Sequence, residues 1–202
     1  MKKRVIALLA LLLATPLTAH AAAEPGQPAP AFTATTSTGE SVALDSLKGK
    51  IVVLEWTNDS CPFVKKHYDG GNMQALQKEI TGKGVIWAQV ISSAPGKQGN
   101  VTGAEAVKLN AERGAVPTYT FLDPEGTLGR LYGAKTTPHM FVIDAKGVLA
   151  YVGAIDDKPS TDKADIAGAH NYVRAAVDEL LAGQPVSTPS TKSYGCSIKY
   201  AG

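Results

Sequence analysis

Cys61 stands between an apolar run, residues 51–56, and a segment that opens with Pro62. The run is typical of a buried strand, and proline is favoured as the first residue of a helix, so the sequence predicts a thiol at a helix N-terminus. The unpaired N–H groups and the positive end of the helix dipole favour an anion there. Because the thiolate, and not the thiol, is the nucleophile, this placement predicts a reactive cysteine rather than a buried, inert one.

The second cysteine, Cys196, lies 14 residues beyond Ala182, in a polar segment close to the C-terminus. With 2 cysteines in 202 residues, the chain differs from small scaffolds that are held together by several closely spaced disulfides. Two interpretations of the pair stay open. Cys61 and Cys196 form one structural disulfide, or they form a redox pair whose bond opens and closes.

Strand and helix patterns alternate along the chain and predict an α/β sandwich, with a mixed central sheet flanked by helices. Strand patterns fall at residues 51–56, 85–91, 118–122, 140–143 and 148–152, and an N-terminal hairpin is expected at residues 31–43. Helix patterns begin near Pro62 and Asn72 and at a capping box formed by Thr102 and Glu105, and the last one covers residues 168–181. Residues 183–202 are expected to form a flexible C-terminal tail that carries Cys196.

The first residues have the pattern of a secretory signal peptide. Three basic residues, Lys2 to Arg4, precede an apolar run that is too short to span a membrane, and Ala19-His20-Ala21 then gives the small-x-small pattern of a cleavage site. Without these three, 17 basic residues remain against 18 acidic ones, a net charge of −1. The mature chain is therefore expected to be periplasmic or secreted, and its charge gives no reason to expect nucleic acid or stable membrane association.

Four segments, in this order, carry a resemblance to the redoxin branch of the thioredoxin fold. They are residues 26–32, the strand that ends in Cys61-Pro62, the dipeptide Thr137-Pro138, and residues 141–147. This branch includes AhpC/TSA-type proteins and the TlpA/ResA-like thioredoxins. The match covers residues 25–182, which we take as one thioredoxin-like redoxin domain between the signal peptide, residues 1–21, and the tail.

The resemblance implies roles for three further residues. Pro138 would form the cis-proline loop that faces the active cysteine, and this loop would leave the backbone of Thr137 free to pair with an incoming disulfide-bearing chain. Glu55 lies six residues before Cys61, where thioredoxins hold a buried acid that passes a proton to the active-site thiol. A strand-end glutamate that faces water is the other interpretation of Glu55.

The chain also departs from the family pattern. Thioredoxins have a second cysteine three residues after the first, where this chain has Val64, so Cys196 or a thiol of another molecule would have to resolve a disulfide on Cys61. The proline and threonine of the family's peroxidase motif fall on Leu54 and Asn58, which argues against efficient peroxide reduction.

These observations predict an exported thiol–disulfide oxidoreductase without a cofactor or metal, in which Cys61 is the nucleophile and Cys196 the resolving thiol. Its partners would be a thiol- or disulfide-bearing protein or small molecule and a reductant that recycles the enzyme. The alternatives are a thiol peroxidase that forms a sulfenic acid on Cys61, and a copper-binding redoxin without enzymatic activity.

Overall fold

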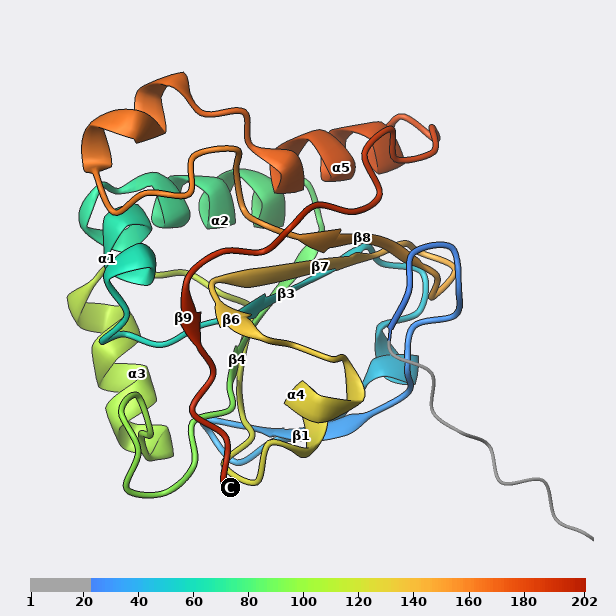
Figure 1. Cartoon of the computed structure of the whole chain (residues 1–202). Coiled ribbons are helices and arrows are strands. Elements are labelled where there is room, and N and C mark those ends of the chain that lie inside the picture. The colour runs from blue at the N-terminus through green and yellow to red at the C-terminus, as the bar shows by residue number, and fades with distance from the viewer. Residues whose placement is uncertain (1–22) are drawn as a thin grey trace, which may run out of the picture.

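The computed structural model describes residues 23–202, so the predicted signal peptide, residues 1–21, lies outside the described residues. A seven-stranded mixed sheet, in the order β2-β1-β5-β4-β3-β7-β8, forms the centre of the molecule (Figure 1). Its strands are β1 (Thr33–Thr36), β2 (Ser41–Ala43), β3 (Val52–Trp56), β4 (Ile86–Ile91), β5 (Tyr119–Leu122), β7 (His139–Ile143) and β8 (Leu149–Gly153). A separate pair joins β6 (Thr136–Thr137) to β9 (Cys196–Ser197).

Helices cover both faces of the sheet because the central strands are apolar on both sides. The α-helices are α1 (Pro62–Asp69), α2 (Asn72–Gly82), α3 (Gly103–Glu112), α4 (Thr127–Leu131) and α5 (Tyr172–Leu181). In β3, Val53 belongs to the core shared with α1, α2 and α5, whereas Leu54 belongs to the core on the opposite face, which includes Leu128 of α4. The mixed sheet flanked by helices confirms the predicted thioredoxin-like fold.

Local signals in the sequence explain most element boundaries. The N-terminal hairpin pairs β1 with β2, and Thr102 and Glu105 form the predicted capping box of α3. Two boundaries differ from the prediction. Helix α5 begins at Tyr172 and not at residue 168, because the Asn171 side chain accepts the N–H of Arg174 and caps it there. The prediction of Asn72 as a helix cap is also wrong, since Gly71 is the N-cap of α2.

The C-terminal tail is ordered, which contradicts the expectation of a flexible segment. It runs along β8, where Thr191 N–H donates to the carbonyl of Val152. It then pairs with β6 through β9 and continues to Lys199, whose carbonyl accepts the N–H of Ala94 (Figure 1). Among residues 23–202, no helix combines the length and the apolar character that crossing a membrane requires.

Candidate functional site

Cys61 is the N-cap residue of α1, as predicted. Its backbone is extended, Pro62 follows as the first helical residue, and the Cys61 carbonyl accepts the N–H of Lys65 at 2.9 Å. Its side chain is completely buried. Strand β3 brings the chain to this point, and the loop between them turns because the Asn58 side chain accepts the N–H of Ser60 at 2.9 Å.

The Thr137–Pro138 peptide bond is cis and lies against the cysteine. Trp56, the last residue of β3, pairs with His139. The Thr137–Pro138 loop, which precedes His139, therefore lies at the end of β3 that leads to Cys61. The Cys61 thiol donates a hydrogen bond to the Thr137 carbonyl, with 3.1 Å between Sγ and O. The sheet therefore holds together two segments that are 76 residues apart in sequence.

Cys196 completes the arrangement. In the antiparallel pair of β6 and β9, Cys196 is the residue opposite Thr137, and Ile198 N–H donates to the Lys135 carbonyl at 3.1 Å. Both cysteines are free thiols in this structure. The backbone edge that we expected to receive an incoming chain is thus occupied by the protein's own tail.

The surroundings shift the pKa values of the two thiols in opposite directions. Burial alone would raise the pKa of Cys61, but interactions with the side chain and backbone of Cys196 and with the Val64 N–H outweigh it, and the pKa lies below its ordinary value. Burial and the neighbouring Cys61 thiolate raise the pKa of Cys196 to about 11. Cys61 is therefore the thiol that ionises first, as expected for a nucleophile.

Glu55 is fully buried inside β3 and faces α1 and α2, so it is not a strand-end residue in water. Its carboxylate accepts hydrogen bonds from Tyr68 Oη at 2.8 Å, Trp87 Nε1 at 2.8 Å and Gln77 Nε2 at 3.2 Å. Burial raises the pKa of Glu55, although Arg113 and these donors oppose the shift. None of its three hydrogen bonds goes to either cysteine, so the structure does not bring Glu55 into the cysteine cluster.

Two histidines, His67 and His139, lie on segments next to Cys61 and Pro138, and both are buried. The His139 ring packs against Phe141 in a tilted arrangement, and its Nδ1 accepts the N–H of Lys135 at 3.2 Å. His67 contacts Tyr194 and Asn72. Burial lowers the pKa of each ring to about 4.

The sequence analysis did not single out Tyr194, Gly195 or Asp156, which anchor the tail beside Cys61. Tyr194 donates to Asp156, and Gly195 lies against the carbonyl of Thr137. One signal was available in the sequence. Apolar or aromatic residues alternate with small or polar ones at the end of the tail: Tyr194, Cys196, Ile198 and Tyr200 are separated by Gly195, Ser197 and Lys199. Such a period of two predicts an extended segment with one face turned inward.

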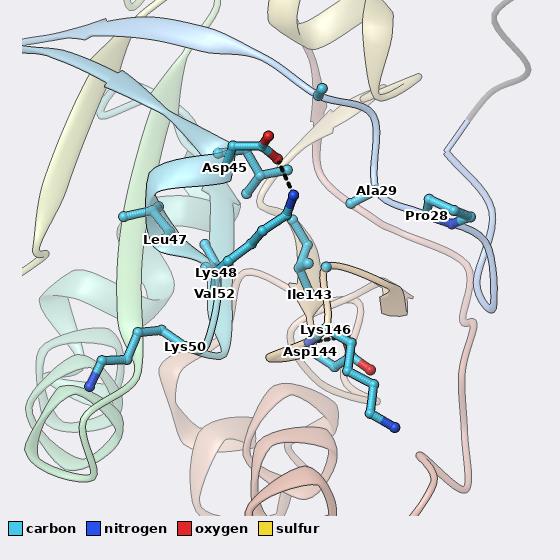
Figure 2. A pocket seen from close by; sticks show the side chains of 13 residues that line it. Pro28, Ala29, Asp45, Leu47, Lys48, Lys50, Val52, Ile143, Asp144 and Lys146 are labelled. Carbon is cyan, nitrogen blue, oxygen red and sulfur yellow. Dashed lines mark hydrogen bonds and ion pairs between the residues drawn. The ribbon is translucent and has the colours of Figure 1, made fainter.

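A separate cavity of about 210 Å³ lies at the opposite end of β3 (Figure 2). Exposed side chains such as Lys48, which pairs with Asp45 at 2.9 Å, surround it together with Val52 and Ile143. It contains neither cysteine. Within residues 23–202, no three His, Cys, Asp or Glu side chains gather closely enough to hold a metal ion.

Comparison with known proteins agrees with this geometry. The model of the AhpC/TSA family matches residues 25–152. The chain belongs to this family. The thioredoxin-like protein YneN of Bacillus subtilis is 28% identical over 144 residues, which cover 70% of this chain and 79% of YneN.

Solved structures show the same fold. An uncharacterized conserved protein from Geobacillus kaustophilus has a TM-score of 0.76 and 27% identity, and the alignment covers 88% of this chain and 92% of that one. A putative thiol:disulfide interchange protein DsbE from Chlorobium tepidum has a TM-score of 0.52 and 27% identity, over 65% of this chain and 85% of that one. The chain is thus a thioredoxin-like redoxin.

Proposed function

We propose that the protein is an exported thiol–disulfide oxidoreductase in which Cys61 is the nucleophile and Cys196 is its redox partner. The observation that carries this proposal is the placement of both thiols at the cis-proline loop. Cys61 Sγ bonds the Thr137 carbonyl at 3.1 Å, and Cys196 is the residue paired with Thr137 in the β6–β9 ladder. Two free thiols on residues that both contact Thr137, one of them with a lowered pKa, are suited to cycling between dithiol and disulfide.

The reaction consists of two thiol–disulfide exchanges. The Cys61 thiolate attacks one sulfur of a substrate disulfide, forms a mixed disulfide and releases the other sulfur as a thiolate. Cys196 then loses its proton and attacks Cys61 Sγ, which forms the Cys61–Cys196 bond and releases the second substrate thiolate. The substrate gains two electrons, and the protein is left with a disulfide that an external dithiol must reduce.

The acidity of Cys196 changes between these steps. Burial is the largest cause of its raised pKa, and the Cys61 thiolate adds a hydrogen bond and a charge that act in the same direction. Once Cys61 is in a mixed disulfide, its charge is gone and both of those contributions disappear. Cys196 therefore becomes easier to ionise at the moment when it has to attack.

We further propose that Thr137 and Pro138 shape the sulfur-binding loop and that Glu55 handles a proton during exchange. The role of Glu55 is supported by its burial and by a pKa that burial raises above the ordinary value, although its hydrogen bonds reach Tyr68, Gln77 and Trp87 and neither cysteine. Glu55→Gln should slow exchange and shift its pH profile while the fold survives. An unchanged pH profile would assign Glu55 to the polar network of Tyr68 and Trp87 alone.

Export is supported by the basic and apolar pattern of residues 1–21. The substrate is a disulfide in a protein or small molecule. A polypeptide that pairs with Thr137 has to displace the tail first, because Cys196 occupies that edge. A small disulfide needs a smaller opening, but because Cys61 is completely buried, the tail has to move for it as well.

The deciding experiment is a thiol count on the mature protein and on Cys61→Ser and Cys196→Ser variants, after treatment with a dithiol, a small disulfide or peroxide. The proposal expects an internal disulfide in the wild type that a dithiol reduces readily, and a trapped mixed disulfide on Cys61 in Cys196→Ser. A bond that resists reduction and raises the melting temperature would indicate a structural disulfide. Turnover with peroxide but not with disulfides would establish the peroxidase alternative.

A further inference from the structure

One face of α1 receives the tail. Phe63, Lys66 and His67 have the spacing of residues on one side of a helix, and all three lie around the ring of Tyr194. The Phe63 and Tyr194 ring centroids are 5.8 Å apart, and Lys66 Nζ is 6.0 Å from the Tyr194 ring centroid. The helix that Cys61 caps therefore also holds the tail two residues before Cys196.

A directed chain of hydrogen bonds fixes the hydroxyl of Tyr194. Asn72 Nδ2 donates to His67 Nδ1 at 2.8 Å, so His67 Nδ1 is the accepting nitrogen and Nε2 carries the proton. His67 Nε2 then donates to Tyr194 Oη at 3.2 Å, and Tyr194 donates to Asp156 Oδ1. A neutral imidazole fits this chain because each of its nitrogens has one defined role.

Asp156 favours the docked position of the tail over a detached one. The side chain is 1% exposed, and its second oxygen, Oδ2, has no hydrogen-bond partner among the described residues and lies 3.9 Å from His67 Nε2. The other oxygen, Oδ1, accepts from the hydroxyl of Tyr194 and from the N–H of Lys158. Since a buried carboxylate that loses a donor is costly, Asp156 favours the position in which Tyr194 is in place.

We propose that Tyr194, held by Asp156 and His67, is a positioning residue that sets the distance and orientation of Cys196 relative to Cys61. This inference rests on the proposed function, in which the two thiols form a redox pair. Its consequence is that formation of the Cys61–Cys196 disulfide depends on the hydroxyl of Tyr194, which takes no part in thiol exchange itself. The quantity that reports it is the effective concentration of Cys196 at Cys61.

The test compares Tyr194→Phe with the wild type in mixtures of oxidised and reduced glutathione. The substitution keeps the ring against Phe63 and removes only the hydroxyl. Since a hydrogen bond to a charged group is lost, the effective concentration should fall roughly tenfold or more. Tyr132→Phe is the matched control, because its buried hydroxyl donates to the Pro30 carbonyl at 2.8 Å and not to the tail. It should leave the effective concentration unchanged.

A second measurement does not depend on redox activity. In a Cys196→Ser background, Cys61 is covered by the docked tail, so Tyr194→Phe should speed its alkylation by a small reagent. Asp156→Asn provides an independent variant and should act in the same direction. Wild-type effective concentration and wild-type alkylation rates in both variants would overturn the positioning role. A wild type that forms no Cys61–Cys196 bond at any glutathione ratio would overturn the proposed function, and the alkylation rates would still decide whether Tyr194 holds the tail.

Discussion

Gly195→Ala tests whether the contact between the tail and the cis-proline loop controls the cysteine pair. Gly195 has a φ of +134°, a region that residues with a side chain rarely adopt. A methyl group there would overlap the carbonyl oxygen of Thr137 and would lie 2.7 Å from its carbonyl carbon and 3.2 Å from the nitrogen of Pro138. These are backbone atoms of the loop that binds Cys61, so β9 has to move away from β6.

The size of the effect has a lower and an upper bound. Unfavourable backbone conformation costs about 1–3 kcal/mol, which corresponds to roughly a 5- to 150-fold loss in the effective concentration of Cys196. The overlap with Thr137 adds to this cost and places the expected loss in the upper part of that range. The loss has a limit, because a detached tail still tethers Cys196 to α5, and short flexible tethers give effective concentrations in the millimolar range.

The assay is the ratio of disulfide to dithiol at fixed glutathione ratios, quenched with acid and read by mass spectrometry. Gly147→Ala is the matched control, since Gly147 has a φ of +86° but nothing within 4 Å of the added methyl group. It carries the backbone cost without touching the tail, so its effective concentration should equal that of the wild type. If Gly195→Ala stays within twofold of the wild type, the tail does not position Cys196 through β9, and the argument from the β6–β9 pair is wrong.

Three further predictions follow from the buried ionisable groups and from the N-terminus. Because burial raises the folded-state pKa of Glu55, its contribution to stability is complete below about pH 4.5 and is lost as the pH rises through the folded value; urea unfolding of Glu55→Gln should lack this loss. The pKa of His67 and of His139 is lowered to about 4 from an ordinary 6.5, so the stability that each neutral ring provides should be lost as the pH falls from 6.5 to 4, by up to about 3 kcal/mol per ring. Because Glu55 acts in the opposite direction over part of this interval, the histidine effect is measured in Glu55→Gln, where a flat stability from pH 6.5 to 4 would contradict it. Mass spectrometry of the exported protein should show a chain that begins after Ala21 or Ala23, and an intact Met1 would refute the signal peptide.

The sequence was sufficient for the parts of the fold that rest on local pattern. The apolar run of β3 and the proline after Cys61 predicted the strand–helix junction, and the capping box at Thr102 predicted the start of α3. The resemblance to redoxins supplied the cis peptide at Pro138, which no local pattern shows. The sequence left open whether Glu55 is buried or faces water, and the structure shows that it is buried.

The polar network around the tail could not be predicted in the same way. His67, Asp156 and Tyr194 come from three distant parts of the chain, and each is an ordinary polar residue in its own sequence neighbourhood. Only the fold, which brings the segment after β8, the last turn of α1 and the tail to one place, puts them together. The composition of the tail pointed to flexibility, but tertiary contacts with β8, β6 and Ala94 order it.

The position of the second thiol changes what controls the redox pair. A cysteine at position 64 would be held by one turn of α1, and its distance from Cys61 would follow from helix geometry alone. Here that position is Val64, and the partner thiol stands 135 residues after Cys61 on a strand of its own. Its distance from Cys61 is set by the contacts of Gly195 and Tyr194. In the proposed reaction, a substrate chain that pairs with Thr137 would break the β6–β9 pair and withdraw Cys196 in the same step. Cys196 would then stay away from a mixed disulfide for as long as a polypeptide occupies that edge, and would return when the edge is released.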